Sequence, residues 1–497
     1  MPFLAFLFQA LFLSALSISV YRIFFHPLRK FPGPRLAAVS TFYQAYYDII
    51  QNGKFLEHLH WLHNIYGPVV RIGPNKLHFS TPEAYHDIYT HGATFTKSHS
   101  ALYGAFGLAG NSFTLTDLAK ARERRAVINP LFSRRSILKL EGLIQDLVDQ
   151  FLFQILSQSS SEKSVNMTFA LRSLTMDIIT SYCFATSIKT IDYPGFMHPI
   201  PLALRGTVES LWIQKHFPFL MQLPFLISWS LMVRLIPGFA VAEEQKAEFR
   251  RQIEKCRTNS NGGDQEPEHQ TVFHYLLAHQ GISDESLVEE AFTLIGAGSD
   301  TVANACIVGI NAALTKPEIG KRLIEELREA WPDGNLNGGF GYARLEKLPY
   351  LTAFIKESLR CSFGVVSPLP RVVGPGDAKI GGCDVPSETI VATSCVFLHQ
   401  NPDGFPNPSE FSPERWLEPG ARDLESRYLV PFSRGTRLCL GLNLAWAELY
   451  LVLGNMFRKL DMDIIGGKDD DYIKFREIFI PLWKCQHLNV VATQARG

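Results

Sequence analysis

The chain has 497 residues, 46% of them hydrophobic, so it is long enough to bury a large apolar core. Its 48 Lys and Arg residues balance 48 Asp and Glu residues, which indicates neither a nucleic-acid partner nor a strongly charged substrate. The eight cysteines include no Cys-x-x-Cys pair, which argues against a zinc site and against the disulfide framework of a small secreted domain. A reducing compartment fits this cysteine usage best.

An apolar segment opens the chain. Residues 2–21 carry no charge, and a helix needs about 20 apolar residues to cross a bilayer. Arg22, Arg29 and Lys30 follow, so the positive-inside rule places the rest of the chain in the cytosol. The alternatives are a cleaved signal peptide, which lacks the expected preceding basic residue, and a buried helix. We expect residues 1–25 to form a single-pass transmembrane anchor.

A proline-rich segment follows over residues 26–34, where prolines stop a helix and stiffen a short linker. Beyond it, residues 35–497 show no internal repeat and read as one domain, mainly α with small β-sheets. Alternation over residues 69–79 predicts a hairpin. Helices are predicted over residues 136–157, 165–183, 240–257, 286–314, 317–331, 348–361 and 442–457, and loops over residues 157–161, 259–270 and 334–341.

Basic residues cluster within residues 118–133, just before a turn, and include Arg124 and Arg125. Such a cluster serves a bound anion or forms a solvated basic helix face. The segment alone leaves both interpretations open.

A long helix is predicted to begin at Ser283, an N-cap candidate with acidic residues in the first turn. It contains Ala297-Gly298-Ser299-Asp300-Thr301, in which Ala297 and Thr301 share a face. A threonine hydroxyl that bonds back to the carbonyl four residues earlier would loosen the helix there. The alternative is a polar break or packing notch in a core helix.

Glu357 and Arg360 lie three residues apart on an apolar helix, so they share one face. Spacing alone is weak evidence, because Glu325 and Arg328 show the same pattern and are expected to be a surface pair of little value. The context differs, since the segment Phe411 to Trp416, which contains Arg415, follows the apolar helix.

Cys439 lies in residues 432–441 (FSRGTRLCLG), directly before an apolar helical run. A thiolate there is near the positive end of a helix dipole, which favours the ionised sulfur that a metal ion needs. An ordinary buried cysteine is the alternative. The segment also supplies an aromatic cover for the sulfur, a guanidinium for a carboxylate, and two glycines that let the backbone approach a flat ligand: Phe432, Arg437, Gly435 and Gly441.

These ten residues resemble the cysteine-ligand loop of the cytochromes P450, with every defining position present. The segment Ala297–Thr301 matches that family's Ala-Gly-x-Asp/Glu-Thr pattern. Glu357, Arg360 and Arg415 resemble its buried structural network, and Arg371 lies where the family has a strand arginine. The resemblance implies the cytochrome P450 fold, with haem b between the long helix and the cysteine loop.

Site roles follow from the same resemblance. Cys439 would be the axial ligand of the haem iron, and Thr301 and Asp300 would deliver protons for oxygen cleavage. Ala297 and the room left by Gly298 would lie over the iron. The residues expected to contact the haem or its propionates are Phe432, Gly435, Gly441, Arg437, Arg371 and Arg125. The family usually has an aromatic residue or histidine where this chain has Ala121, which leaves the propionate contact between Arg124 and Arg125.

The activity implied is that of a haem-thiolate monooxygenase that inserts one oxygen atom from O2 into an apolar small molecule. The expected electron donor is NADPH-cytochrome P450 reductase, with cytochrome b5 as a further candidate, at the endoplasmic reticulum membrane. The chain looks similar to fungal P450s of secondary metabolism, of the trichodiene-oxygenase-like group, which points to a terpenoid, polyketide or alkaloid intermediate. A haem-thiolate isomerase or dehydratase, or a non-enzymatic membrane haem protein, is the alternative.

Overall fold

The computed structural model describes most of the chain, and the statements below concern the described residues. Of the predicted loops, residues 160–161, 261–270 and 334–338 lie outside them. The described residues are 2–90, 95–97, 102–159, 163–202, 206, 210–220, 231, 234, 237–260, 271–279, 281–332, 339–465, 474–483 and 488–495.

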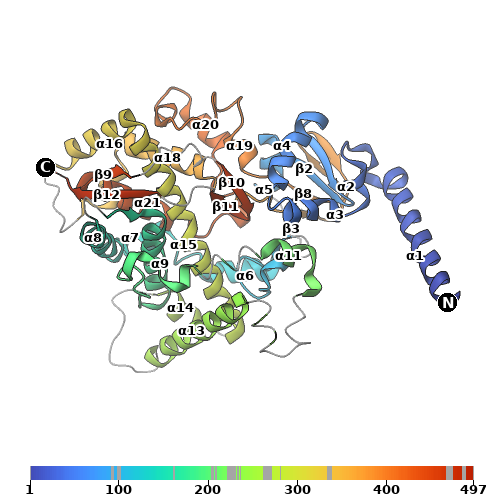
Figure 1. The fold of residues 1–497 in the computed structure, drawn as a ribbon, viewed down its shortest axis with the longest axis horizontal. Helices are drawn as coiled ribbons and strands as arrows, with labels where there is room; N and C mark the ends of the chain where they lie inside the picture. Colours follow the sequence, from blue (N-terminus) through green and yellow to red (C-terminus); the bar gives the residue numbers. More distant parts are fainter. Residues whose placement is uncertain are drawn as a thin grey trace.

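The domain is mainly helical, as the sequence predicts, and the 32-residue helix α15 (Asp284–Thr315) runs through its middle (Figure 1). Five helices pack directly against α15: α9 (Met167–Phe184), α13 (Pro237–Ser260), α16 (Pro317–Ala330), α18 (Pro349–Ser362) and α21 (Leu442–Lys459). The other helical segments are α1 (Pro2–Val20), η1 (Tyr21–Phe25), η2 (Pro27–Lys30), α2 (Arg35–Val39), α3 (Phe42–Ala45), η3 (Tyr46–Ile50), α4 (Phe55–Tyr66), α5 (Pro82–Tyr89), η4 (Tyr103–Phe106), α6 (Leu118–Ile128), α7 (Arg134–Leu138), α8 (Glu141–Gln158), η5 (Pro194–Phe196), α11 (Leu211–His216), α14 (Val272–Leu277), α17 (Tyr342–Leu345), α19 (Val396–His399), η7 (Pro413–Trp416), α20 (Ala421–Tyr428) and η8 (Gly435–Arg437).

Four small sheets complete the described part of the fold. The largest has the order β1 (Val69–Gly73), β2 (Lys76–Phe79), β8 (Ile390–Ala392), β5 (Arg371–Val373), β3 (Phe95–Lys97), and only the β2–β8 pairing is parallel. The predicted hairpin is its β1–β2 edge. The others are β4 (Val165–Asn166), β12 (Asn489–Gln494) and β9 (Leu460–Ile464); β10 (Phe475–Ile478) and β11 (Ile480–Trp483); and β6 (Ala378–Ile380) and β7 (Cys383–Val385).

Local capping explains where several helices begin. The Ser283 side chain accepts a hydrogen bond from the Ser286 amide and starts α15, as predicted. The single helix predicted over residues 136–157 is wrong, because the chain forms α7 and then α8. Ser133 caps α7, and short-range bonds from the amides of Lys139 and Leu140 close it after one turn. The helix predicted from Val165 starts two residues later, at the Asn166 cap, because β4 pairs with β12.

Two hydrophobic clusters form the core. The larger one lies between α15, the helices that pack against it, and α8, which packs against α9 and α21. The second surrounds the five-stranded sheet, where α4 and α5 cover the strands. Residues at the junction of the two clusters can therefore face both the central helix and the sheet.

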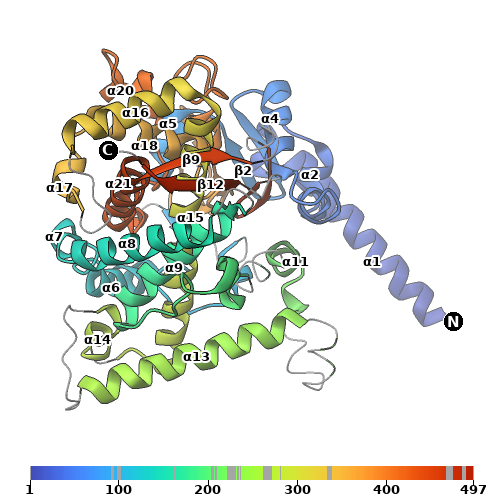
Figure 2. The same ribbon diagram turned by 60° about the vertical axis from the view of Figure 1, so that its left-hand side comes forward.

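The N-terminal helix α1 projects away from the body of the domain (Figures 1 and 2). Among the described residues, two helices are long and apolar enough to span a bilayer: Phe3–Phe25, none of it buried, and α15, which is a core helix. The segment 26–34 is attached to the domain, because Leu28 is buried and the Arg71 amide donates to Pro32 O at 2.7 Å. A side chain at Gly33 would meet the Arg71 carbonyl, so this short linker lies firmly against β1.

Candidate active site

The Cys439 loop lies between η8 and the start of α21. The Cys439 amide donates to the Phe432 carbonyl at 2.9 Å, which closes the loop. The thiol is exposed, yet the surrounding protein raises its pKa by desolvation, against the lowering effects of the Gly441 amide and the nearby Arg125 charge. A side chain that is both accessible and closely surrounded faces an internal space. Its thiolate would therefore be available to a metal ion bound there.

The two glycines of this loop have different reasons to be glycine. A Cβ on Gly441 would meet nothing within 4 Å, so this glycine leaves room for a closely approaching ligand. Gly435 has φ +68°, and a Cβ there would lie 2.1 Å from Tyr89 O and 2.2 Å from Thr90 O. The prediction that Gly435 makes room for a ligand therefore needs correction: it lets the loop pack against the end of α5. The Phe432 ring packs toward Trp446 of α21, with centroids 6.4 Å apart.

Three arginines converge beside the thiol. Arg125 donates from Nη2 to Leu438 O at 2.8 Å, one residue before Cys439. Arg371, 5% exposed at the start of β5, donates to Tyr103 Oη at 2.8 Å. Arg437 donates from Nη2 to Leu115 O, while its Nη1 is buried without a hydrogen-bond partner in the described structure.

No direct ion pair compensates the charges of this group in the described structure, and Glu290 acts on Arg125 only from farther away. Burial and repulsion by Arg125 and Arg371 lower the pKa of Arg437 to about 10. Within the described residues, no carboxylate lies within 4 Å of any of the three guanidinium groups. Burying like charges together is costly unless an anion joins them. The arrangement therefore suits a ligand with more than one negative group.

The position of Arg124 bears on whether Arg124 or Arg125 contacts a propionate, a question that the sequence leaves open. Arg124 pairs with the fully buried Glu290 of α15 at 3.2 Å and donates to Ser286 Oγ at 2.8 Å. Ala121 is buried and has no polar group that could contact a propionate. The geometry favours Arg125 for the anion contact and gives Arg124 a role in fixing α6 to α15.

The middle of α15 opens onto unfilled space at one position. Ala297 is the one exposed residue between Ser286 and Thr315, a stretch that the structure describes completely. Thr301 Oγ1 donates to the Ala297 carbonyl at 3.0 Å, the bond that the sequence predicts. The expected loosening does not interrupt the helix, which is continuous from Asp284 to Thr315. Support from α9 explains this, because Thr175 Oγ1 donates to the Ser299 carbonyl at 2.6 Å.

The surroundings of Gly298 differ from the expectation that this glycine leaves room over the iron. A Cβ there would lie 2.8 Å from Ile179 Cγ1 of α9, so the missing side chain allows close packing of the two helices. The alternative of a packing notch therefore describes Gly298, whereas Ala297 is the residue that faces open space.

Asp300 also has an unforeseen partner. Its Oδ1 lies 2.6 Å from Arg172 Nε of α9, and the two side chains are only 16% and 10% exposed. A carboxylate in this setting is held by a fixed charge rather than free in solvent. In any proton transfer that involves Asp300, the Arg172 guanidinium therefore stays next to the carboxylate.

A buried ion network lies behind the site. Glu357 and Arg360, both fully buried, pair through Oε1–Nη2 at 2.7 Å and Oε2–Nε at 2.9 Å. Arg415 Nε reaches Glu357 Oε1 at 3.2 Å, and the Trp416 indole and the Ser412 amide each donate to the same carboxylate at 2.9 Å. The Arg360 guanidinium also donates to the carbonyls of His399, Pro408 and Glu410. The predicted three-residue network is present and is larger than expected.

Several partners could not be found from sequence reasoning. Tyr103, Arg172 and Trp416 act through contacts with residues far away in the chain, and none stands in a motif whose spacing reveals the partner. Val366 is fully buried in the core around the five-stranded sheet, which indicates packing rather than ligand contact. Phe479 lies between β10 and β11 and packs edge-on against Phe106.

The chemistry of these groups fits the haem that the sequence predicts. One accessible thiol can ligate the iron, and three guanidinium groups with an unused donor can hold two propionates. The glycine at the start of α21 leaves room beside the sulfur.

We expect Glu357→Gln to lower the free energy of unfolding by about 3–5 kcal/mol, because Arg360 and Arg415 would lose their counter-charge inside the protein. Urea unfolding measures the change. The matched control is Glu325→Gln, since Glu325 pairs with Lys321 at 3.8 Å on the surface and should matter by less than about 0.5 kcal/mol. Equal effects of the two substitutions would contradict a buried network.

We expect Gly435→Ala to destabilise the protein far more than Gly376→Ala. Both glycines have positive φ, so each substitution costs about 1–2 kcal/mol in backbone strain. Only Gly435 adds a collision with the Tyr89 and Thr90 carbonyls, because Gly376 has open space around it. Thermal unfolding of the two variants checks this, and similar midpoints would refute the packing role.

The comparisons with known proteins cover nearly all of the chain. A sequence profile of the cytochrome P450 family matches residues 32–482. The N-acetyltryptophan 6-hydroxylase ivoC of Emericella nidulans is 32% identical over 477 residues, 94% of this chain and 93% of that protein. The conidiogenone synthase PchP450 of Penicillium rubens is 33% identical over 464 residues, 92% of each. The cytochrome P450 monooxygenase macH of Penicillium terrestre is 33% identical over 475 residues, which cover 93% of this chain and 92% of that protein. With a profile and relatives that each span most of its length, the chain belongs to the cytochrome P450 family.

Proposed function

We propose that this chain is a membrane-anchored haem-thiolate monooxygenase that hydroxylates or epoxidises an intermediate of secondary metabolism. As a member of its family it takes a cysteine-ligated haem, O2, an organic substrate and electrons from a reductase. The observation that carries the proposal is the accessible Cys439 thiol beside three arginines that have no carboxylate partner among the described residues.

In this proposal Cys439 ligates the iron, and Arg125, Arg371 and Arg437 hold the propionates. The unused Nη1 of Arg437 supports the last assignment, because a propionate oxygen would satisfy it. When bound, the haem with its thiolate supplies the oxygen activation and insertion chemistry. Glu357, Arg360 and Arg415 hold the core behind the loop and take no part in the chemistry.

The helix α15 supplies the proton-handling groups. Because the Thr301 hydroxyl donates to the Ala297 carbonyl, its oxygen lone pairs stay free to accept a hydrogen bond from water or ligand. The Asp300 side chain keeps 16% of its surface exposed to solvent, and its contact with Arg172 fixes its position next to Thr301. Positioned groups of this kind contribute about 10²–10⁴-fold to a rate.

The substrates proposed for this chain form a narrower class than those of the family as a whole. The relatives include proteins named for hydroxylation of N-acetyltryptophan and tryptophan and for conidiogenone synthesis. A largely apolar terpenoid, polyketide or alkaloid intermediate fits both this range and the aromatic contacts of Phe106, Phe113 and Phe479.

The proposed organisation is an anchor over residues 1–25, a hinge over residues 26–34 and a haem domain over residues 35–497. The exposed apolar helix Phe3–Phe25 and the basic residues after it support a single pass with the domain in the cytosol. An endoplasmic reticulum location, with NADPH-cytochrome P450 reductase and cytochrome b5 as electron donors, is consistent with such an anchor.

We expect Cys439→Ser to abolish the red-shifted Soret band that the reduced carbonyl complex of a thiolate-ligated haem shows. Difference spectroscopy of purified protein measures it, and Cys383→Ser, at a free cysteine of β7 outside the loop, should retain the band. An unchanged band in Cys439→Ser would end the ligand assignment. NADPH-dependent product formation with the reductase then separates a monooxygenase from an isomerase, which turns over without it.

We expect Thr301→Ala to retain the haem spectrum while diverting reducing equivalents to hydrogen peroxide. Product formed per NADPH consumed should fall several-fold, within the loss of about 10²–10⁴ that removing a proton-handling group causes. Thr315→Ala is the matched control, since Thr315 makes the same back-bond, 2.7 Å to Asn311 O, at the end of the same helix. Unchanged coupling in Thr301→Ala would refute the proton-delivery role.

A further inference from the structure

The end of the N-terminal apolar helix is fixed to the domain by an arginine of β1. Helix α1 continues through η1 to Phe25, and the last four carbonyls of a helix lack partners within that helix. The buried Arg71 donates from Nη1 to the carbonyl of Arg22 at 2.9 Å. Its Nη2 donates to Pro74 O at 2.7 Å, so the guanidinium itself is fixed at the β1–β2 turn. Arg71 therefore caps the apolar helix with a cation that belongs to the folded domain.

Other contacts hold both sides of this junction. The Arg22 guanidinium donates to the carbonyl of Val39, the last residue of α2. Leu28 is fully buried, and a Cβ on Gly33 would collide with the backbone of β1. The proline-rich hinge over residues 26–34 is therefore immobilised on both sides and does not let the helix swing freely.

The surface next to this junction is apolar and exposed. Helices α2 and α3 lie at the base of α1, and α11 packs against α3 and η3 (Figure 1). Leu36 of α2 is 73% exposed, Phe42 of α3 is 65% exposed and Ile50 of η3 is 70% exposed. On α11, Ile213 is also exposed, and the Phe217 ring that follows lies 6.2 Å from the Phe42 ring. One apolar face, formed by α2, α3, η3 and α11, therefore extends from the base of the anchor.

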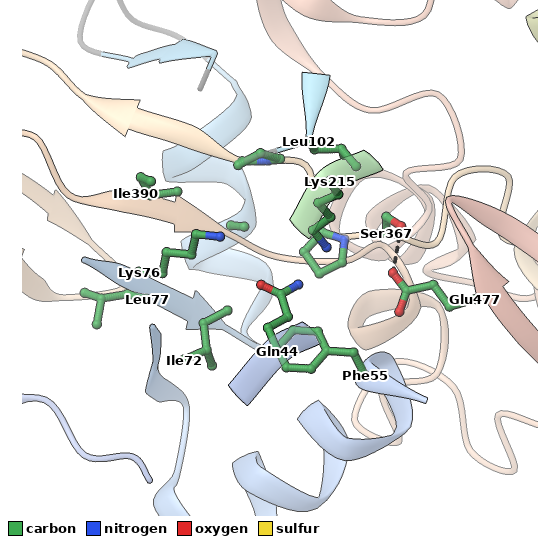
Figure 3. A pocket seen from close by; sticks show the side chains of 13 residues that line it. Gln44, Phe55, Ile72, Lys76, Leu77, Leu102, Lys215, Ser367, Ile390 and Glu477 are labelled. Atoms are coloured by element: carbon green, nitrogen blue, oxygen red, sulfur yellow. Dashed lines mark hydrogen bonds between the residues drawn. The ribbon is translucent and has the colours of Figure 1, made fainter. Parts of the chain in front are cut away.

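The charged side chains of these segments are directed into the protein. Within residues 36–50 and 211–220, which the structure describes completely, the acidic and basic residues are Asp48, Lys215 and His216. Asp48 Oδ2 accepts from Lys215 Nζ at 2.8 Å and lies 2.6 Å from His216 Nε2, and none of the three side chains is more than 9% exposed. Lys215 also lines a small pocket of the domain (Figure 3). Surfaces that face water normally carry charged residues, so this face suits an apolar partner.

A lipid bilayer is the partner that the face fits. The face begins where the apolar helix leaves the domain, so it lies at the level where an anchor enters the membrane. Arg29, Lys30 and Arg35 are exposed at the same junction, where they would meet anionic headgroups. Short helices with phenylalanine and leucine on the outer side are suited to the boundary between headgroups and acyl chains.

We propose that Arg71 joins the anchor and the domain into one rigid body and thereby holds the face of α2, α3, η3 and α11 in the headgroup layer of the bilayer. Apolar helix faces in such a layer are buried by about 5–10 Å. The inference extends the proposed membrane anchor and rests on it. It gives Arg71 a role in orientation of the domain and none in the chemistry.

Photocrosslinking of the full-length haem protein in nanodiscs of phosphatidylcholine and phosphatidylserine tests the face. The photoreactive residue p-benzoyl-phenylalanine replaces Phe42 in one variant and Phe153 of α8 in the matched control. Both phenylalanines are 65% exposed, and α8 and α1 lie on opposite sides of the molecule in Figure 1. Mass spectrometry should find phospholipid adducts at position 42 and none at position 153. Absence of adducts at position 42, equal yields at both positions, or crosslinks from position 42 to a second copy of the chain overturn the lipid contact.

Two further variants test the rigid connection. Arg71→Met removes the cap, and a Gly-Ser-Gly-Ser insert between Val20 and Tyr21 uncouples the anchor without a change in the domain. Each should lower the yield of lipid adducts at position 42 several-fold while the Soret band is retained. Arg422→Met, at an exposed arginine of α20, should leave the yield unchanged.

An unchanged yield in the insert variant, or in a folded Arg71→Met protein, overturns the rigid connection. A chain that does not purify with the nanodiscs overturns the anchor together with this face. The Cys439 and NADPH tests of the proposed function depend on neither, so the two failures are distinguishable.

Discussion

The fully buried carboxylate of Glu357 is the contact on which the rest of the site depends. It receives donors from α18 and from residues 412–416, two segments that are more than 50 positions apart in the chain. Charge in a low-dielectric core is tolerated only when every donor and acceptor is satisfied. The Arg360 guanidinium also donates hydrogen bonds to the carbonyls of residues 399, 408 and 410. One ion pair therefore fixes the path of the chain toward the Cys439 loop.

The opposite electrostatic condition holds on the other side of that loop. Arg125, Arg371 and Arg437 are brought together with no carboxylate in reach among the described residues, which lowers the pKa of Arg437. The clustered positive charge destabilises the protein without a ligand, because the arginines repel one another. The same positive charge attracts a dianion and therefore stabilises a complex with one. The satisfied network therefore holds the scaffold, and the unsatisfied one selects the ligand. Stability and binding are assigned to different charges.

Sequence patterns predicted the features that short-range physics determines. The capped helix α15, the β1–β2 hairpin, the Thr301 back-bond and the pairing of Glu357 with Arg360 depend on residues a few positions apart. Features that depend on a distant neighbour were not predictable. The direction of the missing Gly298 Cβ is set by Ile179, and the Asp300 partner lies on another helix, while Gly435 is required by carbonyls of α5. Within residues 136–157 the hydrophobic periodicity is continuous and predicts one helix. Hydrogen bonds at the end of α7 nevertheless close that helix at Leu138, before α8 begins.

The contact between Arg371 and Tyr103 connects the arginine group to a neighbouring small pocket (Figure 3). Tyr103 accepts a hydrogen bond from Arg371, and the residues on either side of that contact, Leu102 and Pro370, line the pocket. Because Arg371 is held on one side by β5 and on the other by the Tyr103 hydroxyl, a shift of either segment moves both the guanidinium and the pocket wall. Close packing transmits such a shift rather than absorbing it. Ordering of the arginine group by a bound dianion would therefore also order the pocket wall formed by Leu102 and Pro370.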